Sequence, residues 1–250
     1  MKRPLSVRDV GELLQRSPRT RNAILVGGQS LNLWAVNLGL AAEAAVVSRD
    51  IDFFGSRADA IAAGLDWQAE VHTGSLDDHT PNSAVVVVEI ENEQHGIDFL
   101  NSIAGVDTEE LRRWAARVRG QTYDFYVMHP LHVLQSQLEN VYGLLRRREE
   151  QDGDYYVDRV ILAIRVAAAA VAALLDEGRV REALKAAERI ATIAPSRPAL
   201  AAWARDEVNM LDAIPDHPAW PKRFVQRRLL QIASHVRDQR DKHQQGSRRR

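Results

Sequence analysis

The sequence predicts an α+β protein in which short strands and helices alternate through the first half and a helical bundle follows. Three observations support this fold class. Apolar runs of strand length recur up to residue 128, and the branched run Ala84–Glu91 is the clearest of them. From His129 and Pro130 onward the apolar residues recur at helical spacing only. The 250 residues are enough for one large or two small domains with buried cores.

The first half is expected to begin with a short helix that packs through Val10, Leu13 and Leu14. The elements that follow are read from apolar patterning and from turn residues. They are a strand at Ile24–Val26, a helix from Ser30 to Leu38, a strand through Asp50–Phe53, a helix at Arg57–Ala63, a strand at Trp67–His72, a loop at Gly74–Ser83, the strand Ala84–Glu91, a hairpin turn at ENEQHG, a strand around Asp98, a helix carrying Leu111, Trp114 and Val118, and a strand at Thr122–Met128.

The second half is expected to contain helices alone. Its first helix carries an apolar stripe from Leu131 to Leu145, and prolines separate the later helices. The other helices are expected at Tyr155–Leu175, Val180–Ile193, Pro198–Leu211 and Lys222–Val236. We therefore expect a first domain over residues 1–128, a helical domain over 129–243 and a disordered basic tail over 244–250.

The composition is that of an ordinary globular protein and contains no cysteine, which excludes disulfides and thiolate metal sites. No signal peptide is visible, and the most apolar stretch, Val160–Leu175, contains Arg165 and is too short to span a membrane. We expect a cytoplasmic protein without a membrane partner. From Lys222 onward ten basic residues face two acidic ones. This end either contacts a polyanion or is a solvated helix end, and the second interpretation is favoured.

A tight turn follows the first predicted strand. Gly27 and Gly28 permit backbone angles and a close approach that side chains would forbid. If Ser30 begins the next helix, its hydroxyl and the free amide groups of the first turn point at whatever lies above the glycines. Helix starts of this kind suit an anion. Gly27, Gly28 and Ser30 are therefore predicted to bind phosphate groups.

Three carboxylates complete the predicted site. Asp50 and Asp52 are two residues apart, so on a strand both side chains point to one face while Ile51 and Phe53 point into a core. Two adjacent carboxylates repel each other unless a cation lies between them, and oxygen ligands suit magnesium or manganese. Asp98 lies in the same apolar, acidic, apolar pattern and is the predicted third ligand.

These residues resemble the DNA polymerase beta-like nucleotidyltransferases, whose pattern is a Gly-Gly or Gly-Ser turn, then Asp-x-Asp, then a third Asp on a later strand. The sequence is most similar to small bacterial AbiEii-like members, in which a helical domain follows. Here the matching residues are Gly27, Gly28 and Ser30, then Asp50, Asp52 and Asp98. The resemblance covers roughly residues 20–145, and it implies a nucleotidyltransferase-type mixed sheet flanked by helices.

The resemblance also implies a mechanism. Asp50, Asp52 and Asp98 would be both catalytic residues and ligands of Mg²⁺ or Mn²⁺, and Gly27, Gly28 and Ser30 would hold the phosphates of a nucleoside triphosphate. A nucleoside monophosphate would pass to a hydroxyl of RNA, a protein or a small molecule, and pyrophosphate would leave. The resemblance implies a toxin of a toxin-antitoxin pair, with an antitoxin as its partner.

Two alternatives remain open. In the family a basic residue follows the Pro of the first bundle helix and faces the nucleotide. Here Gln137 occupies that position, and Asn140 lies one turn further on. A basic side chain nearby could take over this role, from Arg146, Arg147 or Arg148. Together with the 21 residues between Gly28 and Asp50, this motivates an inactive nucleotide-binding module. The third hypothesis is a protein-interaction scaffold that acts through the helical half and the basic tail.

Other polar and aromatic residues are interpreted as structural. His72 and His79 are expected to be solvated or locally hydrogen-bonded, His95 to lie in the hairpin turn, and His129 and His132 to cap or pack a helix start. The acidic pairs Asp77-Asp78 and Glu91-Glu93 are expected to be solvated loop charges, and Trp34, Trp67 and Trp114 to pack in the core or at a domain junction.

Overall fold

The computed structural model describes residues 7–16, 22–40, 50–73, 82–119, 124–144 and 153–247. By its internal contacts the chain divides into two compact units, Met1–Ser136 and Gln137–Arg250. No helix in the described ranges combines the length and the apolar character needed to cross a membrane.

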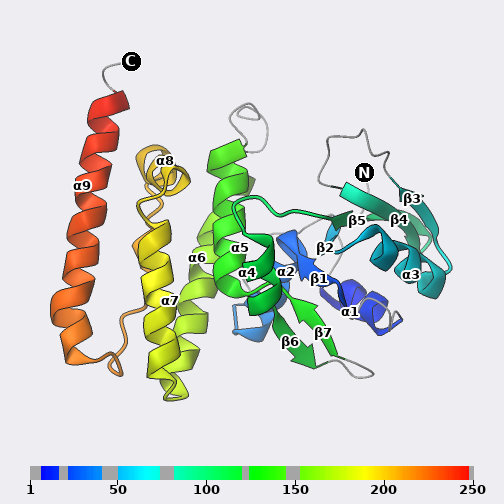
Figure 1. The fold of residues 1–250 in the computed structure, drawn as a ribbon, viewed down its shortest axis with the longest axis horizontal. Helices are drawn as coiled ribbons and strands as arrows, with labels where there is room; N and C mark the ends of the chain where they lie inside the picture. Colours follow the sequence, from blue (N-terminus) through cyan, green and yellow to red (C-terminus); the bar gives the residue numbers. More distant parts are fainter. Residues whose placement is uncertain are drawn as a thin grey trace. The chain divides into compact units, whose positions relative to one another are not determined.

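The first unit is built on a mixed sheet, and the described strands follow the order β3-β4-β5-β2-β1-β7-β6 (Figure 1). The pairs β1/β7 and β2/β5 are parallel and the others are antiparallel. The alternation of helices and strands that the sequence predicts is therefore confirmed as an α+β arrangement. The strands are β1 (Ile24–Val26), β2 (Ile51–Phe54), β3 (Glu70–Thr73), β4 (Asn82–Ile90), β5 (Glu93–Leu100), β6 (Ala116–Arg119) and β7 (Asp124–Val127).

The helices of this unit start at recognisable caps. Ser56 and Asp59 form a reciprocal capping box at the start of α3, and the Asp107 carboxylate accepts from the backbone amides of Glu109 and Glu110 at the start of α4. These caps satisfy amide groups that the first turn leaves without partners. The helices are α1 (Val7–Gln15), α2 (Gly27–Asn37), α3 (Arg57–Trp67), α4 (Thr108–Trp114) and α5 (Pro130–Leu138), whose last two residues belong to the second unit.

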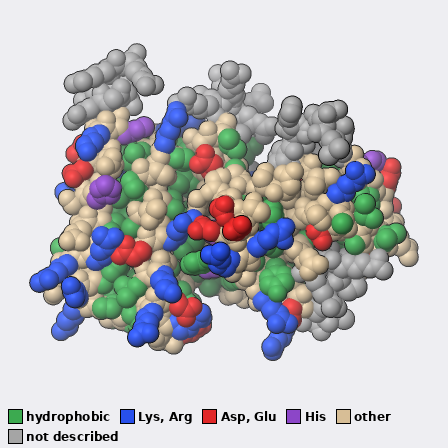
Figure 2. Space-filling model, viewed as in Figure 1, with side chains coloured by type: hydrophobic (Ala, Val, Ile, Leu, Met, Phe, Trp, Pro, Cys, Tyr) green, Lys and Arg blue, Asp and Glu red, His purple; other side chains and the backbone are tan. Residues whose placement is uncertain are grey.

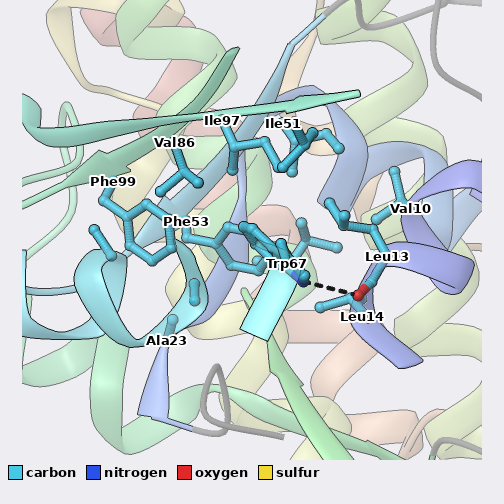
Figure 3. Packing of buried hydrophobic residues seen from close by; sticks show 14 of the residues in the cluster. Val10, Leu13, Leu14, Ala23, Ile51, Phe53, Trp67, Val86, Ile97 and Phe99 are labelled. Carbon is cyan, nitrogen blue, oxygen red and sulfur yellow. Dashed lines mark hydrogen bonds between the residues drawn. The ribbon is translucent and has the colours of Figure 1, made fainter. Parts of the chain in front are cut away.

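One face of the sheet packs against α1 and α3 and forms the core of the unit (Figure 3). The rings of Phe53 and Phe99 stack with centroids 5.4 Å apart. The Trp67 indole Nε1 donates to the Leu13 carbonyl at 3.2 Å, which ties α3 to α1. Because side chains alternate along a strand, the residue before each of these phenylalanines points to the opposite face.

Several predicted elements are wrong in detail. Trp67 ends α3 and does not begin a strand, because the helix continues to a left-handed cap at Gln68. Val118 lies in β6 and not in a helix, since α4 stops at Trp114 and exposed Arg117 and Arg119 alternate with half-buried neighbours. His95 is a buried strand residue in β5, because the hairpin turn is confined to Glu91 and Asn92, both with positive φ.

The described part of the second unit contains helices and no strand. Val160, Ala163 and Ala167 on α6 are completely buried, as befits a central helix. On α9 the Arg240 guanidinium lies 4.7 Å above the Trp203 ring of α8. Lys and Arg side chains are frequent on the face of α9 drawn in Figure 2. The elements are a π-helical turn (Glu139–Leu144), α6 (Gly153–Asp176), α7 (Val180–Ile193), α8 (Arg197–Asp206), a 3₁₀ turn (Met210–Ala213), a second π-helical turn (Phe224–Leu229) and α9 (Leu230–Ser247).

Candidate functional site

Asp52 and Asp98 lie side by side on neighbouring strands. The parallel pairing of β2 and β5 sets Asp52 directly opposite Asp98, and Phe53 opposite Phe99. Phe53 and Phe99 are buried in the core, so both carboxylates point to the other face of the sheet. Adjacent strands are about 4.8 Å apart, which places two half-buried carboxylates next to each other. This pair is the centre of the candidate site.

Asp50 lies just before β2 and is exposed. Burial raises the pKa of the Asp98 carboxyl above its ordinary value, and the negative charge of Asp50 raises it further. The three predicted acidic residues therefore come together closely enough for Asp98 to respond to Asp50 electrostatically. Both effects disfavour the charged form of Asp98, and a cation bound beside the carboxylate would offset them.

The donor set has the chemistry that a divalent cation requires, because carboxylate oxygens are the preferred ligands of Mg²⁺ and Mn²⁺. Within the described ranges, however, no group of three or more His, Asp or Glu side chains is arranged as a metal-binding cluster. Asp52 and Asp98 share a register, whereas Asp50 lies outside the paired segment. The residues fit the ion by type, and the raised pKa of Asp98 is the effect that a bound cation would reverse.

Gly27 makes room for Asp52. It has a φ of +64°, and a Cβ on residue 27 would lie 2.2 Å from Asp52 Oδ2. β1 and β2 pair antiparallel with Val26 opposite Asp52, so the turn after β1 passes directly over the carboxylate. A glycine is needed at this position for its backbone angle and for the space taken by Asp52. The glycine turn and the Asp-x-Asp segment are therefore in direct contact, through Gly27 and Asp52.

The helix that follows begins earlier than predicted. α2 starts at Gly27 and not at Ser30, and its N-cap Val26 gives no side-chain hydrogen bond. Ser30 is fully buried, and its hydroxyl donates to the Gly27 carbonyl at 2.8 Å. The hydroxyl is therefore engaged within the first turn. Gly28 is buried beside it, and phosphate binding by Gly27, Gly28 and Ser30 stays a prediction.

Asn82, at the start of β4, contacts the carboxylate pair and was missed by sequence reasoning. Its side-chain Nδ2 donates to Asp98 Oδ1 at 3.1 Å. The residue belongs to the stretch predicted as a polar loop, where a single Asn carries no recognisable signal. Only the pairing of β4 with β5 brings Asn82 to Asp98.

Gln137 is buried, with 2% of its surface exposed, whereas Asn140 in the following turn is half-exposed. A long cationic side chain at position 137 would be buried as well, which is costly without a partner. Arg146, Arg147 and Arg148, together with the loop from Gly74 to Pro81 that carries Asp77, Asp78 and His79, lie outside the described residues.

The contacts of His72 and His129 fit structural roles. His72 is exposed near Glu70 on β3. His129 Nδ1 accepts from the Leu131 amide at the start of α5, and its ring meets Trp114 edge to face at 5.5 Å. Capping and packing, the roles predicted for His129, are confirmed. Burial, and secondly His132, lowers the pKa of His129 to about 4.

The sequence matches no protein-family profile, and no curated protein matches it significantly. Among solved structures, the chain is similar to the crystal structure of an antigenic nucleotidyltransferase-like protein from Paracoccidioides brasiliensis. The two share 12% sequence identity, the match covers 74% of this chain and 95% of that chain, and the TM-score is 0.42. A similarity at this level carries no argument about function.

Proposed function

We propose that the chain is a metal-dependent nucleotidyltransferase that moves a nucleoside monophosphate from a nucleoside triphosphate to a hydroxyl acceptor. The observation that carries the proposal is the alignment of Asp52 with Asp98 on adjacent parallel strands, with Gly27 packed over Asp52. The acids and the glycine turn come from separate segments of the sequence. Their convergence on one sheet face is what a site for a cation and a phosphate chain requires.

In this proposal Asp50, Asp52 and Asp98 hold the divalent cations, which when bound neutralise the charge of the triphosphate. The free amide groups at the start of α2, beyond Gly27, bind the outgoing phosphates. Asp98, which lies opposite Asp52 on the same sheet face, accepts the proton of the acceptor hydroxyl. The acceptor oxygen forms a bond to the α-phosphorus, the α–β phosphoanhydride bond breaks, and pyrophosphate leaves.

The acceptor and the biological role are finer parts of the proposal. The resemblance to AbiEii-like proteins would make the chain the toxin of a toxin-antitoxin pair, active in the cytoplasm. RNA, protein and small-molecule hydroxyls are all chemically suitable acceptors, and the fold does not choose among them. An adjacent gene that neutralises toxicity of this chain on expression would support the toxin role.

A second candidate function is an inactive module that binds nucleotides or a protein partner. The observation that favours it is the burial of Gln137, because no cation takes the position that faces the nucleotide in the resembling family. Such a module would retain Asp52 and Asp98 and bind a nucleotide without turnover.

The test is isothermal titration of each nucleoside triphosphate, with Mg²⁺ or Mn²⁺, into the wild type and Asp52→Asn/Asp98→Asn. The control is Asp216→Asn, which removes a charge from an exposed residue of the second unit. Metal-dependent binding that is lost only in the double variant supports the site, and transfer of label from α-labelled nucleotide then separates an enzyme from an inactive module. Equal binding by all three proteins, or none by the folded wild type, contradicts the proposal.

A further inference from the structure

Asp98 lies between two neighbours on its sheet face. On one side the parallel strand β2 sets Asp52 directly opposite Asp98. On the other side the antiparallel strand β4 sets Val85 directly opposite and also supplies Asn82, whose side chain reaches Asp98. The Asn82 side chain donates to Asp98 Oδ1, so one carboxylate oxygen is held and its orientation is set from the β4 side. The hydrogen bond joins a neutral amide to a carboxylate, a kind of pairing stronger than one between neutral groups.

A break in the register of β4 brings Asn82 to this face. Val85 lies opposite Asp98 and Ala84 opposite Phe99, but Asn82 lies opposite Leu100, so Ser83 is an extra residue. Uninterrupted pairing would turn the side chain of residue 82 into the core, on the face of Ala84 and Phe99. The bulge reverses that direction and places Asn82 beside Asp98, as bulges near functional sites often do.

Ser83 holds the bulge in place. Its hydroxyl lies 2.8 Å from the Phe99 carbonyl and 3.1 Å from the Gly55 carbonyl, and it can donate to either. Gly55 follows β2, and its amide donates to the Leu100 carbonyl at 2.9 Å. The extra residue in β4 is thus attached to the ends of both strands that carry the acidic pair.

We propose that Asn82 is a positioning residue for Asp98, which fixes the carboxylate so that its second oxygen is directed to a divalent cation shared with Asp52. The inference rests on the proposed function, since it assigns a role within the same cation site. When a residue that hydrogen-bonds to a metal ligand is replaced, metal affinity commonly falls by about 10- to 100-fold.

The experiment is calorimetric titration of Mn²⁺ into the wild type, Asn82→Leu and Asn101→Ala. Leucine keeps the approximate shape of asparagine and removes the donor. Asn101 is an exposed asparagine directly after β5 and serves as the control. We expect Mn²⁺ affinity to fall about 10- to 100-fold in Asn82→Leu and to be unchanged in Asn101→Ala. A fold-change below twofold in Asn82→Leu, with binding by the wild type intact, overturns the inference and leaves the proposed function standing.

A second measurement separates positioning from a purely structural role. The side-chain amide signals of Asn82 in ¹⁵N spectra, assigned by their loss in Asn82→Leu, should shift when Mg²⁺ is added to the wild type and should not shift in Asp98→Asn. A structural role would instead lower the unfolding midpoint of the metal-free protein and leave the affinity of the folded protein unchanged. Failure of the wild type to bind either ion overturns both proposals, and this failure is visible before any variant is made.

Discussion

Gly27 lies against the carboxylate of Asp52 so closely that a Cβ on residue 27 would be 2.2 Å from Asp52 Oδ2. The two residues come from different strands, and the antiparallel pairing of Val26 with Asp52 brings them together. The glycine turn is therefore part of the wall of the acidic site, in addition to starting a helix.

Replacement of Gly27 by alanine should displace the Asp52 carboxylate. The methyl group cannot fit beside Oδ2, and a φ of +64° costs a non-glycine residue about 1–2 kcal/mol. The matched control is Gly39→Ala, because Gly39 has a φ of +79° with nothing within 4 Å of the added Cβ. Denaturant unfolding and Mn²⁺ titration should show a stability loss in both variants and lost cation binding only in Gly27→Ala. Equal Mn²⁺ affinity in the two variants would show that the Asp52 side chain can move away from the added methyl group and still bind the cation.

Asp98→Asn should stabilise the metal-free protein at neutral pH. The raised pKa of Asp98 means that folding favours its protonated form, so stability declines as the pH rises from the ordinary value of 3.8 through the higher folded value. Asparagine carries no such penalty, and the advantage should vanish at acidic pH where Asp98 is protonated in both states. Chemical unfolding in EDTA across this range checks the sign, with Asp216→Asn as the control. A destabilised variant at neutral pH would refute the cost assigned here to the buried charge of Asp98 and, secondly, to its repulsion from Asp50.

His129 should make the protein sensitive to mild acid. Its pKa is lowered from 6.5 to about 4, so the unfolded chain takes up a proton that the folded chain refuses, and stability is lost as the pH falls through this window. The loss amounts to up to about 3 kcal/mol. Asparagine at position 129 can still accept from the Leu131 amide and does not titrate.

Unfolding free energies at about pH 7.5 and about pH 5 should therefore differ less in His129→Asn than in the wild type. The control substitution is His72→Asn, at an exposed position on β3. An unchanged pH dependence in His129→Asn would mean that His129 is protonated in the folded protein.

Arg240→Gln should destabilise the second unit by about 1 kcal/mol, through loss of the cation that lies 4.7 Å above the Trp203 ring. Arg240 also donates to Asn209, so the variant removes a link between α9 and the segment after α8. Arg237→Gln, three residues earlier on α9 and exposed, removes the same charge without a ring contact or side-chain hydrogen bond among the described residues. Thermal unfolding should separate the two variants, and equal melting temperatures would rule out a specific role for Arg240.

The sequence predicts well those elements whose patterning is local. The apolar run of β4, the alternation around Phe53 and Phe99, and the helical spacing beyond Pro130 each depend on neighbouring residues, and the structure has strands and helices there. The four residues of β6 are too few for their alternation to be distinguished from the end of a helix. His95 was misplaced because the turn needed only two residues, Glu91 and Asn92.

The candidate site is predictable only in part, because local patterning identifies its residues but not the contacts between distant segments. The type and order of Asp50, Asp52 and Asp98 can be read from the sequence, and so can the glycine turn. The contacts of Gly27 with Asp52 and of Asn82 with Asp98 depend on strand pairing between distant segments. A one-residue bulge decides the second of them, and no local pattern announces it.

The three residues of β1 are the narrowest part of the sheet. Antiparallel pairing to β2 on one side and parallel pairing to β7 on the other make Ile24–Val26 the bridge between a β3-β4-β5-β2 half and a β7-β6 half. All three residues are completely or almost completely buried. Opening of this bridge would divide the sheet into two ribbons and release the turn at Gly27 from Asp52 in one event. Amide hydrogens of β1 should therefore exchange with solvent only when the acidic site itself opens. The rate of this exchange would then measure how often the sheet divides at β1 and how often the site is lost.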